Sequence, residues 1–192
     1  MNQILIQYGS IKNLFLRSYP MNSRNFFIVS LIAISLVAFG QTHYGIPTGL
    51  ENVSVQNLSF EREVLSLVNK IRKDHNLNPL LWQEDLARAA RYHAQDMALD
   101  DYMEHATYDR ANKTLIKICG TFQRIEKFKG FPYLAENISA GKPTAKETFD
   151  GWMKSSGHRT NILNPNFKYL GVGYFFLSNS TYQHYWVQDF GG

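Results

Sequence analysis

The chain has 192 residues, of which 44% are hydrophobic and 19% charged, so it is long enough for one domain with a sizeable core and too short for two of ordinary size. Its formal net charge is +4, but three of the 20 basic side chains and none of the 16 acidic ones lie in residues 1–40, so the rest of the chain is nearly neutral. Because there is also no block of like charge, nucleic acid is not expected as a partner.

An apolar run from Phe26 to Gly40 follows Arg24 and precedes a polar stretch. The run is shorter than the roughly 20 residues that a membrane span needs, and its basic flank and small-residue exit are typical of a signal peptide. We interpret residues 1–40 as a leader, with Met21 as an alternative true start. The sequence therefore predicts a secreted or cell-envelope protein with no stable membrane span after leader removal.

Cys119 is the only cysteine, so no disulfide can form within the chain. Small secreted domains of animals and plants are often held by disulfides, whereas this one must be held by its core. That difference favours a bacterial envelope protein. Without a second cysteine or a positioned base, Cys119 is interpreted as a buried or incidental thiol.

Residues 41–57 combine glycine, proline and polar residues without a period, which predicts a linker before a domain at 58–192. From Ser59, a candidate N-cap, apolar residues recur at helical spacing and predict a helix that ends near 75–76. After Pro79 an alanine-rich pattern starting near Gln83 predicts a second helix whose small side chains permit close packing.

Residues 108–133 have a mixed pattern, interpreted as a long excursion with a short helix around Leu115. Thr144 and Glu147 form a capping box for a third helix, which Gly157 is expected to end. Residues 169–177 and 182–190 are rich in aromatic and β-branched side chains, which predicts an antiparallel hairpin. Helices followed by strands indicate an α+β fold.

Four short motifs occur in a fixed order along the chain: residues 104–106 (EHA), 135–138 (AENI), 151–153 (GWM) and 157–165 (GHRTNILNP). A chain with all four resembles the CAP (SCP) superfamily, which includes cysteine-rich secretory proteins, insect venom allergens, plant pathogenesis-related proteins and many bacterial proteins. The resemblance extends over about 130 residues. It implies a three-layer α-β-α sandwich that ends in the C-terminal antiparallel hairpin.

His105, Glu136 and His158 are the candidate site residues. Two imidazoles and one carboxylate can hold Zn²⁺ with a position left for water, although their spacing includes no tight ligand pair. The resemblance implies that these three side chains converge in a central cleft with a second acid. Ser155 stands at the position expected for that acid, and a hydroxyl is a poor metal ligand. Asp109 and Glu126 are candidate replacements.

Each candidate also has an ordinary structural interpretation. His105 and His158 could bind loop carbonyls, and Glu136 could cap backbone amides of its own loop. His93, on the apolar side of the second helix, is interpreted as a packed and hydrogen-bonded histidine. Asn137 and Asn161 are expected to tie loops together.

Two functional hypotheses follow. In the first, the cleft binds an extracellular ligand, a lipid or an envelope component without catalysis, with Zn²⁺ or another divalent metal held weakly. In the second, His105 and His158 hold Zn²⁺, and Glu136 completes the site or acts as general base in a metal-assisted hydrolase of protease-like activity. The absence of an acid at Ser155 favours the first, and whether the protein is an enzyme stays open at this point.

Overall fold

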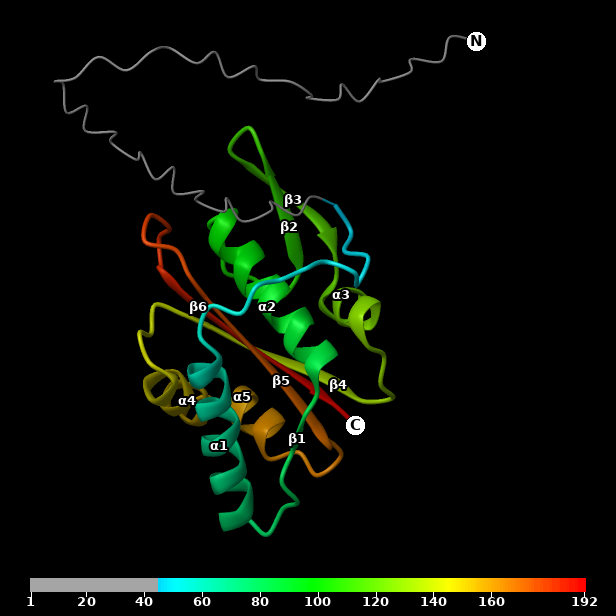
Figure 1. The fold of residues 1–192 in the computed structure, drawn as a ribbon, viewed down its shortest axis with the longest axis vertical. Helices are drawn as coiled ribbons and strands as arrows, with labels where there is room; N and C mark the ends of the chain where they lie inside the picture. Colours follow the sequence, from blue (N-terminus) through cyan, green and yellow to red (C-terminus); the bar gives the residue numbers. More distant parts are fainter. Residues whose placement is uncertain (1–44) are drawn as a thin grey trace, which may run out of the picture. The chain divides into compact units, whose positions relative to one another are not determined.

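The structure is a computed structural model that describes residues 45–192, so the prediction of a leader in residues 1–40 lies outside the described residues. The described part folds into a mixture of helices and strands (Figure 1). In chain order these are α1 (Leu58–Asp74), β1 (Leu81–Trp82), α2 (Glu84–Leu99), β2 (Thr107–Ala111), β3 (Thr114–Cys119), α3 (Thr121–Phe128), β4 (Leu134–Ala140), α4 (Ala145–Lys154), α5 (Ser156–Ile162), β5 (Tyr169–Phe176) and β6 (His184–Gly191).

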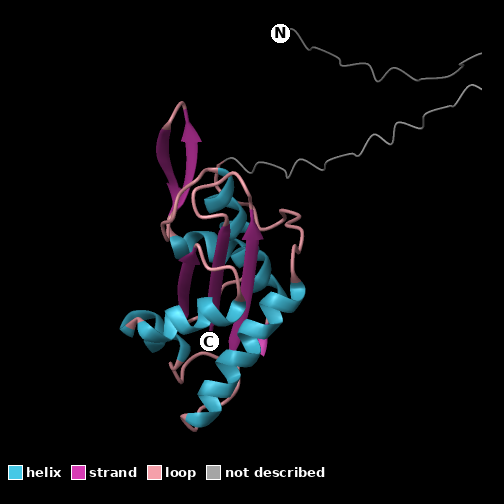
Figure 2. Ribbon diagram, turned by 90° about the vertical axis from the view of Figure 1, so that its left-hand side faces the viewer, coloured by secondary structure: helices cyan, strands magenta, loops and turns pink. Residues whose placement is uncertain are grey.

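A four-stranded sheet in the order β1-β5-β6-β4 forms the centre of the domain, and helices cover both of its faces (Figure 2). Side chains on a strand alternate between faces, and β6 shows the division clearly. Trp186 packs in a core shared with α1, α4 and α5, whereas its neighbours Tyr185 and Val187 pack against α2. The expected α+β class and the C-terminal antiparallel pair of β5 and β6 are confirmed.

Helix α2 lies unusually close to β5, because both partners present small residues at the contact. Ala87 and Ala90 on the helix are fully buried, and the facing strand positions are Gly171 and Gly173. A Cβ atom added at either glycine would overlap backbone atoms of α2. The alanine-rich sequence of α2 therefore allows the helix to pack closely against β5, as the sequence predicted.

Strand β4 is the edge of the sheet, and side chains from α4 and α5 bind its outward carbonyls. The Trp152 indole donates to the Ile138 carbonyl at 3.0 Å, and the Asn161 amide donates to the Glu136 carbonyl at 3.4 Å. Unpaired carbonyls on a strand edge need such partners when helices bury them. The edge that carries Glu136 is thereby fixed against α5.

Residues 45–57, for which the sequence predicts a linker, lie against the domain in the structure. Gly49, with a φ of 83°, contacts the Lys127 backbone so closely that no side chain would fit. Arg88 donates to the Gly49 carbonyl at 2.8 Å, and Val53 packs with Tyr92 in a small cluster. These contacts hold the segment along α2 and α3.

The predicted helices are present with shifted ends. The N-cap of α1 is Asn57, whose side chain accepts from the Phe60 amide at 3.1 Å, so the choice of Ser59 was wrong by two positions. Thr144 caps α4 as expected, but α4 ends at Lys154 and a new helix starts at once. Gly157 lies inside that new helix and does not end the third one.

The excursion at 108–133 contains strands that the sequence interpretation missed. Leu115 lies in β3, which pairs with β2 in a hairpin that projects beyond the main sheet (Figures 1 and 2), so the predicted helix there is wrong. The two strands are joined by Asn112 and Lys113, both with positive φ. A tight hairpin turn requires such angles, and Asn-Lys carries a weaker turn signal than Asn-Gly.

Candidate functional site

The sheet edge at β4 brings Glu136 and His105 together. Nδ1 of His105 lies 2.8 Å from Oε1 of Glu136. An ionised carboxylate only accepts, so Nδ1 must donate, and Nε2 of the neutral imidazole keeps its lone pair. The Glu136 side chain is 1% exposed and that of His105 is 51% exposed, so the free nitrogen belongs to the accessible partner.

Arg124 of α3 occupies the other oxygen of Glu136. Its guanidinium is fully buried and also donates to the His105 carbonyl at 3.0 Å and to Thr107 Oγ1 at 3.1 Å. Thr121, at the start of the same helix, donates to the His105 carbonyl at 2.9 Å. Helix α3 therefore fixes both the backbone of His105 and the carboxylate that orients its ring.

A second buried acid lies beside Glu136. Asp189 is its partner in the register of β4 and β6, is fully buried, and has no hydrogen-bond donor for its carboxyl oxygens among residues 45–192. Burial raises the pKa of Glu136, but the charge of Arg124 and the bond from His105 outweigh it and lower that pKa to about 2. Burial and the Glu136 charge raise the pKa of Asp189 well above its usual value.

His158 comes from α5, which packs on the opposite face of the sheet. Its backbone carbonyl accepts from Asn137 at 3.2 Å, and Asn137 also accepts from Asn161 at 2.9 Å. The two asparagines therefore tie strand β4 to helix α5, whereas the sequence predicted that they tie loops together. Partial burial and the positive charge on His105 lower the pKa of the His158 imidazole. The bond from Asn137 places the His158 backbone beside the residue that follows Glu136.

His93 is fully buried behind this cluster. Nε2 of its ring lies 2.9 Å from the Glu104 carbonyl, and burial lowers its pKa to about 3. It is thus a neutral, packed histidine, as its place in α2 indicates. Because it is inaccessible, it adds no ligand to the cleft.

The donor atoms of the candidate site do not fit a three-ligand zinc site. Both oxygens of Glu136 are bound by His105 and Arg124, and Ser155, in the place of the second acid, is the residue between α4 and α5. Of the replacements considered, Asp109 lies in β2 and Glu126 lies on the exposed side of α3. Only Nε2 of His105 and the His158 imidazole remain, whereas catalytic zinc takes three protein ligands.

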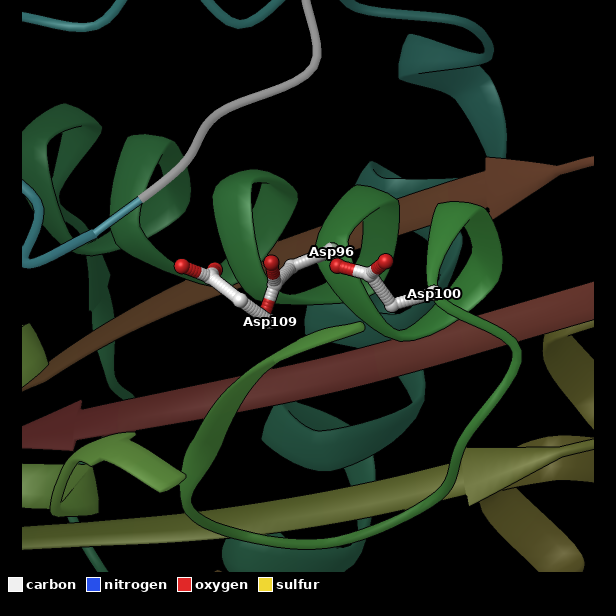
Figure 3. Close-up of side chains that lie close together, drawn as sticks. All are labelled: Asp96, Asp100 and Asp109. Carbon is white, nitrogen blue, oxygen red and sulfur yellow. The ribbon is translucent and has the colours of Figure 1, made fainter. Parts of the chain in front are cut away.

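Another acidic group lies away from the cleft. Asp96 of α2, Asp100 at its C-terminus and Asp109 of β2 offer oxygens within 4.8 Å of one another (Figure 3). Asp96 accepts from Tyr102, Asp100 accepts from the Arg110 amide and Asp109 from the Gly45 amide. Burial raises the pKa of Asp96 to about 7, which reduces repulsion. The group fastens the β2–β3 hairpin and the N-terminal segment to α2.

The model of the cysteine-rich secretory protein family, CAP, matches residues 65–190, which includes His105, Glu136 and His158. The chain belongs to this family. The resemblance drawn from the four motifs is therefore confirmed. The CAP domain here contains a single, buried cysteine despite the family's name.

Similar proteins include bacterial ones. Uncharacterized protein YkwD of Bacillus subtilis (strain 168) is 37% identical over 118 residues, which is 60% of this chain and 42% of YkwD. An extracellular protein from Bacillus anthracis that contains an SCP domain is 30% identical, with a TM-score of 0.57, covering 68% of this chain and 39% of that one. This CAP chain thus spans under half the length of these relatives.

An outer surface protein from Borrelia burgdorferi shares the fold, with a TM-score of 0.57 and 21% identity, over 68% of this chain and 90% of that one. At this identity the likeness concerns the fold alone. Among residues 45–192 no helix has the length and apolar character needed to cross a membrane.

The opposite pKa shifts of His105 and His158 can be tested. We expect the His105 imidazole to titrate above pH 6.5, because its bond to Glu136 raises the pKa, and His158 to titrate below it. Because the pKa of His105 is higher in the folded than in the unfolded state, its contact with Glu136 stabilises the fold fully below the unfolded pKa of about 6.5. This stabilisation is lost as the pH rises through the higher pKa of the folded state. Proton NMR of the ring Hε1 signals would measure both values.

A His158→Asn variant assigns the signals and should leave His105 above pH 6.5. Equal titration of the two rings in the parent protein would contradict the assignment of Glu136 as the partner of His105.

Proposed function

We propose that this CAP domain works outside the cell as a binding module, in which the cleft at the edge of β4 captures an extracellular ligand or envelope component without catalysis. The observation that carries the proposal is the engagement of Glu136. Arg124 and His105 bind its two oxygens and only 1% of the side chain is exposed. Such a carboxylate cannot approach a substrate or a metal-bound water without breaking a buried ion pair.

We infer that the cleft presents a pair of imidazoles instead. His105 is held by α3 and by Glu136, and His158 by α5. An oriented imidazole can donate or accept a hydrogen bond at Nε2, and rigid placement lowers the entropic cost of binding. An extracellular location is supported by the expected leader, and the B. anthracis and B. burgdorferi neighbours are described as extracellular and outer-surface proteins.

A divalent ion would be held by Nε2 of His105 and by His158, and therefore weakly. The ion would offer a Lewis-acidic contact to an oxygen atom of the ligand. His105 is suited to this contact because its second nitrogen donates to a carboxylate, an arrangement that orients metal-binding histidines. The hydrolase hypothesis, in contrast, needs Glu136 as a base or a third ligand, and both of its oxygens are engaged.

Titration of the purified protein with Zn²⁺ by calorimetry tests this proposal. We expect a dissociation constant weaker than about 10 μM, because only two protein ligands are free. The His105→Ala/His158→Ala variant should show no heat of binding. Replacement of the exposed His75 at the end of α1 by alanine is the matched control and should change nothing.

One-to-one binding of Zn²⁺ in the nanomolar range that is lost in the double variant would contradict the proposal and favour the hydrolase hypothesis. The same would follow if the protein cleaved a casein substrate and a Glu136→Gln variant, still folded, did not.

A further inference from the structure

A pocket of about 400 Å³ lies beside the β4 residues that lead to Glu136, between α3, the segment 129–133 and α5. Two of its lining residues connect it to the cleft. Asn161 donates to Asn137 and to the Glu136 carbonyl, and Phe122 follows Thr121, which binds the His105 carbonyl. The pocket therefore borders the His105–Glu136 pair along the edge of β4, and its volume suits a small-molecule ligand or one or two sugar rings.

Aromatic rings form a preorganised floor in this pocket. The ring of Phe131 packs on Tyr169 at 5.3 Å and lies over Gly191, where an added Cβ would come within 2.6 Å of it. Phe167 stacks on the buried Phe190 at 5.3 Å between ring centroids. Because neighbours on β5 and β6 fix both rings, a ligand would not have to order them.

Two further aromatic rings stand at the rim. Phe122 is 51% exposed and Tyr133 is 55% exposed, and both line the pocket. Single exposed aromatic residues are ordinary, but two rings at the mouth of a concave, aromatic-floored pocket provide flat apolar faces for a ligand.

The polar groups of the pocket retain hydrogen-bonding capacity. Asn161 uses its amide nitrogen on Asn137 and Glu136, which leaves its oxygen free. Asn164 uses its oxygen on the Asn166 amide, which leaves its nitrogen free. The Glu126 carboxylate has no hydrogen-bond or ion-pair partner among residues 45–192. The pocket therefore offers one amide donor and two acceptors beside aromatic faces.

We propose that this pocket binds the pyranose rings of a neutral oligosaccharide. The inference rests on the proposed binding function and names the chemical class of the ligand. Sugar hydroxyls both donate and accept, which matches the free groups of Glu126, Asn161 and Asn164, and the C–H face of a pyranose ring is flat enough to stack on Phe122 or Tyr133. No lysine or arginine lines the pocket, so an anionic ligand is not favoured.

An extended peptide is a poorer fit at the same edge. Strand addition requires outward carbonyls on β4, and those of Glu136 and Ile138 are already bound by Asn161 and Trp152. A fatty-acid chain would leave the free amide and carboxylate groups of the pocket without partners.

The test is calorimetric titration of the purified protein with tri-N-acetylchitotriose and with cellotriose, which separates N-acetylated from plain sugars, and with laurate as the apolar alternative. We expect one of the trisaccharides to bind with a dissociation constant below about 10 mM. The Phe122→Ser/Tyr133→Ser variant should bind it at least about tenfold more weakly. Phe176→Ser/Tyr182→Ser removes two other exposed rings, 41% and 43% exposed, outside the pocket and should bind as the parent does.

The proposal is overturned if neither trisaccharide binds at up to about 10 mM, if laurate alone binds, or if both pairs of aromatic replacements have equal effects. Circular dichroism and urea unfolding of each variant ensure that lost binding reflects the pocket and not the fold. The His105→Ala/His158→Ala variant separates the two proposals. If the histidine variant still binds the sugar, the result supports the pocket as the ligand site and contradicts the proposal that the two imidazoles bind it. If the histidine variant and the Phe122→Ser/Tyr133→Ser variant both lose binding, the result supports one continuous site.

Discussion

Replacing Arg124 with methionine is expected to lower the free energy of unfolding by about 3–5 kcal/mol, because it leaves Glu136 charged and buried without its cation. The same change removes the donors to the His105 carbonyl and to Thr107. Methionine is close to arginine in length and keeps the apolar contacts of the stem. Urea unfolding followed by circular dichroism would measure the difference.

Arg159→Met is the matched control, because this arginine is exposed and bonds only the Met153 carbonyl, so its loss should cost under about 1 kcal/mol. Combining Arg124→Met with Glu136→Gln removes the unpaired charge and should recover part of the lost free energy of unfolding. The double-mutant cycle then measures the interaction free energy between Arg124 and Glu136. A loss for Arg124→Met as small as that of the control would show that Glu136 does not depend on this ion pair.

Gly171→Ala is expected to destabilise the domain by about 3 kcal/mol, because the new Cβ would overlap backbone atoms of Leu86 and Ala87. Backbone atoms cannot move aside as a flexible side chain can, so α2 as a whole must shift away from β5. The shift would loosen the contacts of Ala90, Ala94 and the rest of that helix face. Thermal and urea unfolding would both report the loss.

Gly151→Ala provides a control of opposite sign. Gly151 lies inside α4 with open space around it, so alanine should raise stability by roughly 0.5–1 kcal/mol through its higher helix propensity. If Gly171→Ala were as harmless as this change, the close approach of α2 to the sheet would be wrong.

Patterns with strong local signals were predictable from the sequence. The helical periods of α1 and α2 and the aromatic strands β5 and β6 each bury one face, so composition and spacing identified them. The β2–β3 hairpin was missed because its strands are short and half exposed and its turn residues are Asn112 and Lys113. Strand β4 was missed because its Glu-Asn motif interrupts the alternation expected of a strand.

The candidate site was predictable only in part. The motifs named His105, Glu136 and His158, and the structure joins His105 directly to Glu136 and places the His158 backbone against Asn137. Arg124 and Asp189 carry no motif, and their roles depend on the packing of α3 and on the register of β4 with β6. A usable signal did exist, since Gln188-Asp189 is a polar pair inside an otherwise apolar strand, and such a buried acid calls for an explanation.

The bonds that Asn161 and Trp152 make to β4 also affect how the domain behaves at high concentration. An open sheet edge with free carbonyls can template pairing with a second molecule, which leads to aggregation. Here the Asn161 amide that binds Asn137 also occupies the Glu136 carbonyl, and the Trp152 indole occupies the Ile138 carbonyl. Loss of Asn161 is therefore expected to promote self-association through this edge as well as to weaken the ligand capture proposed above.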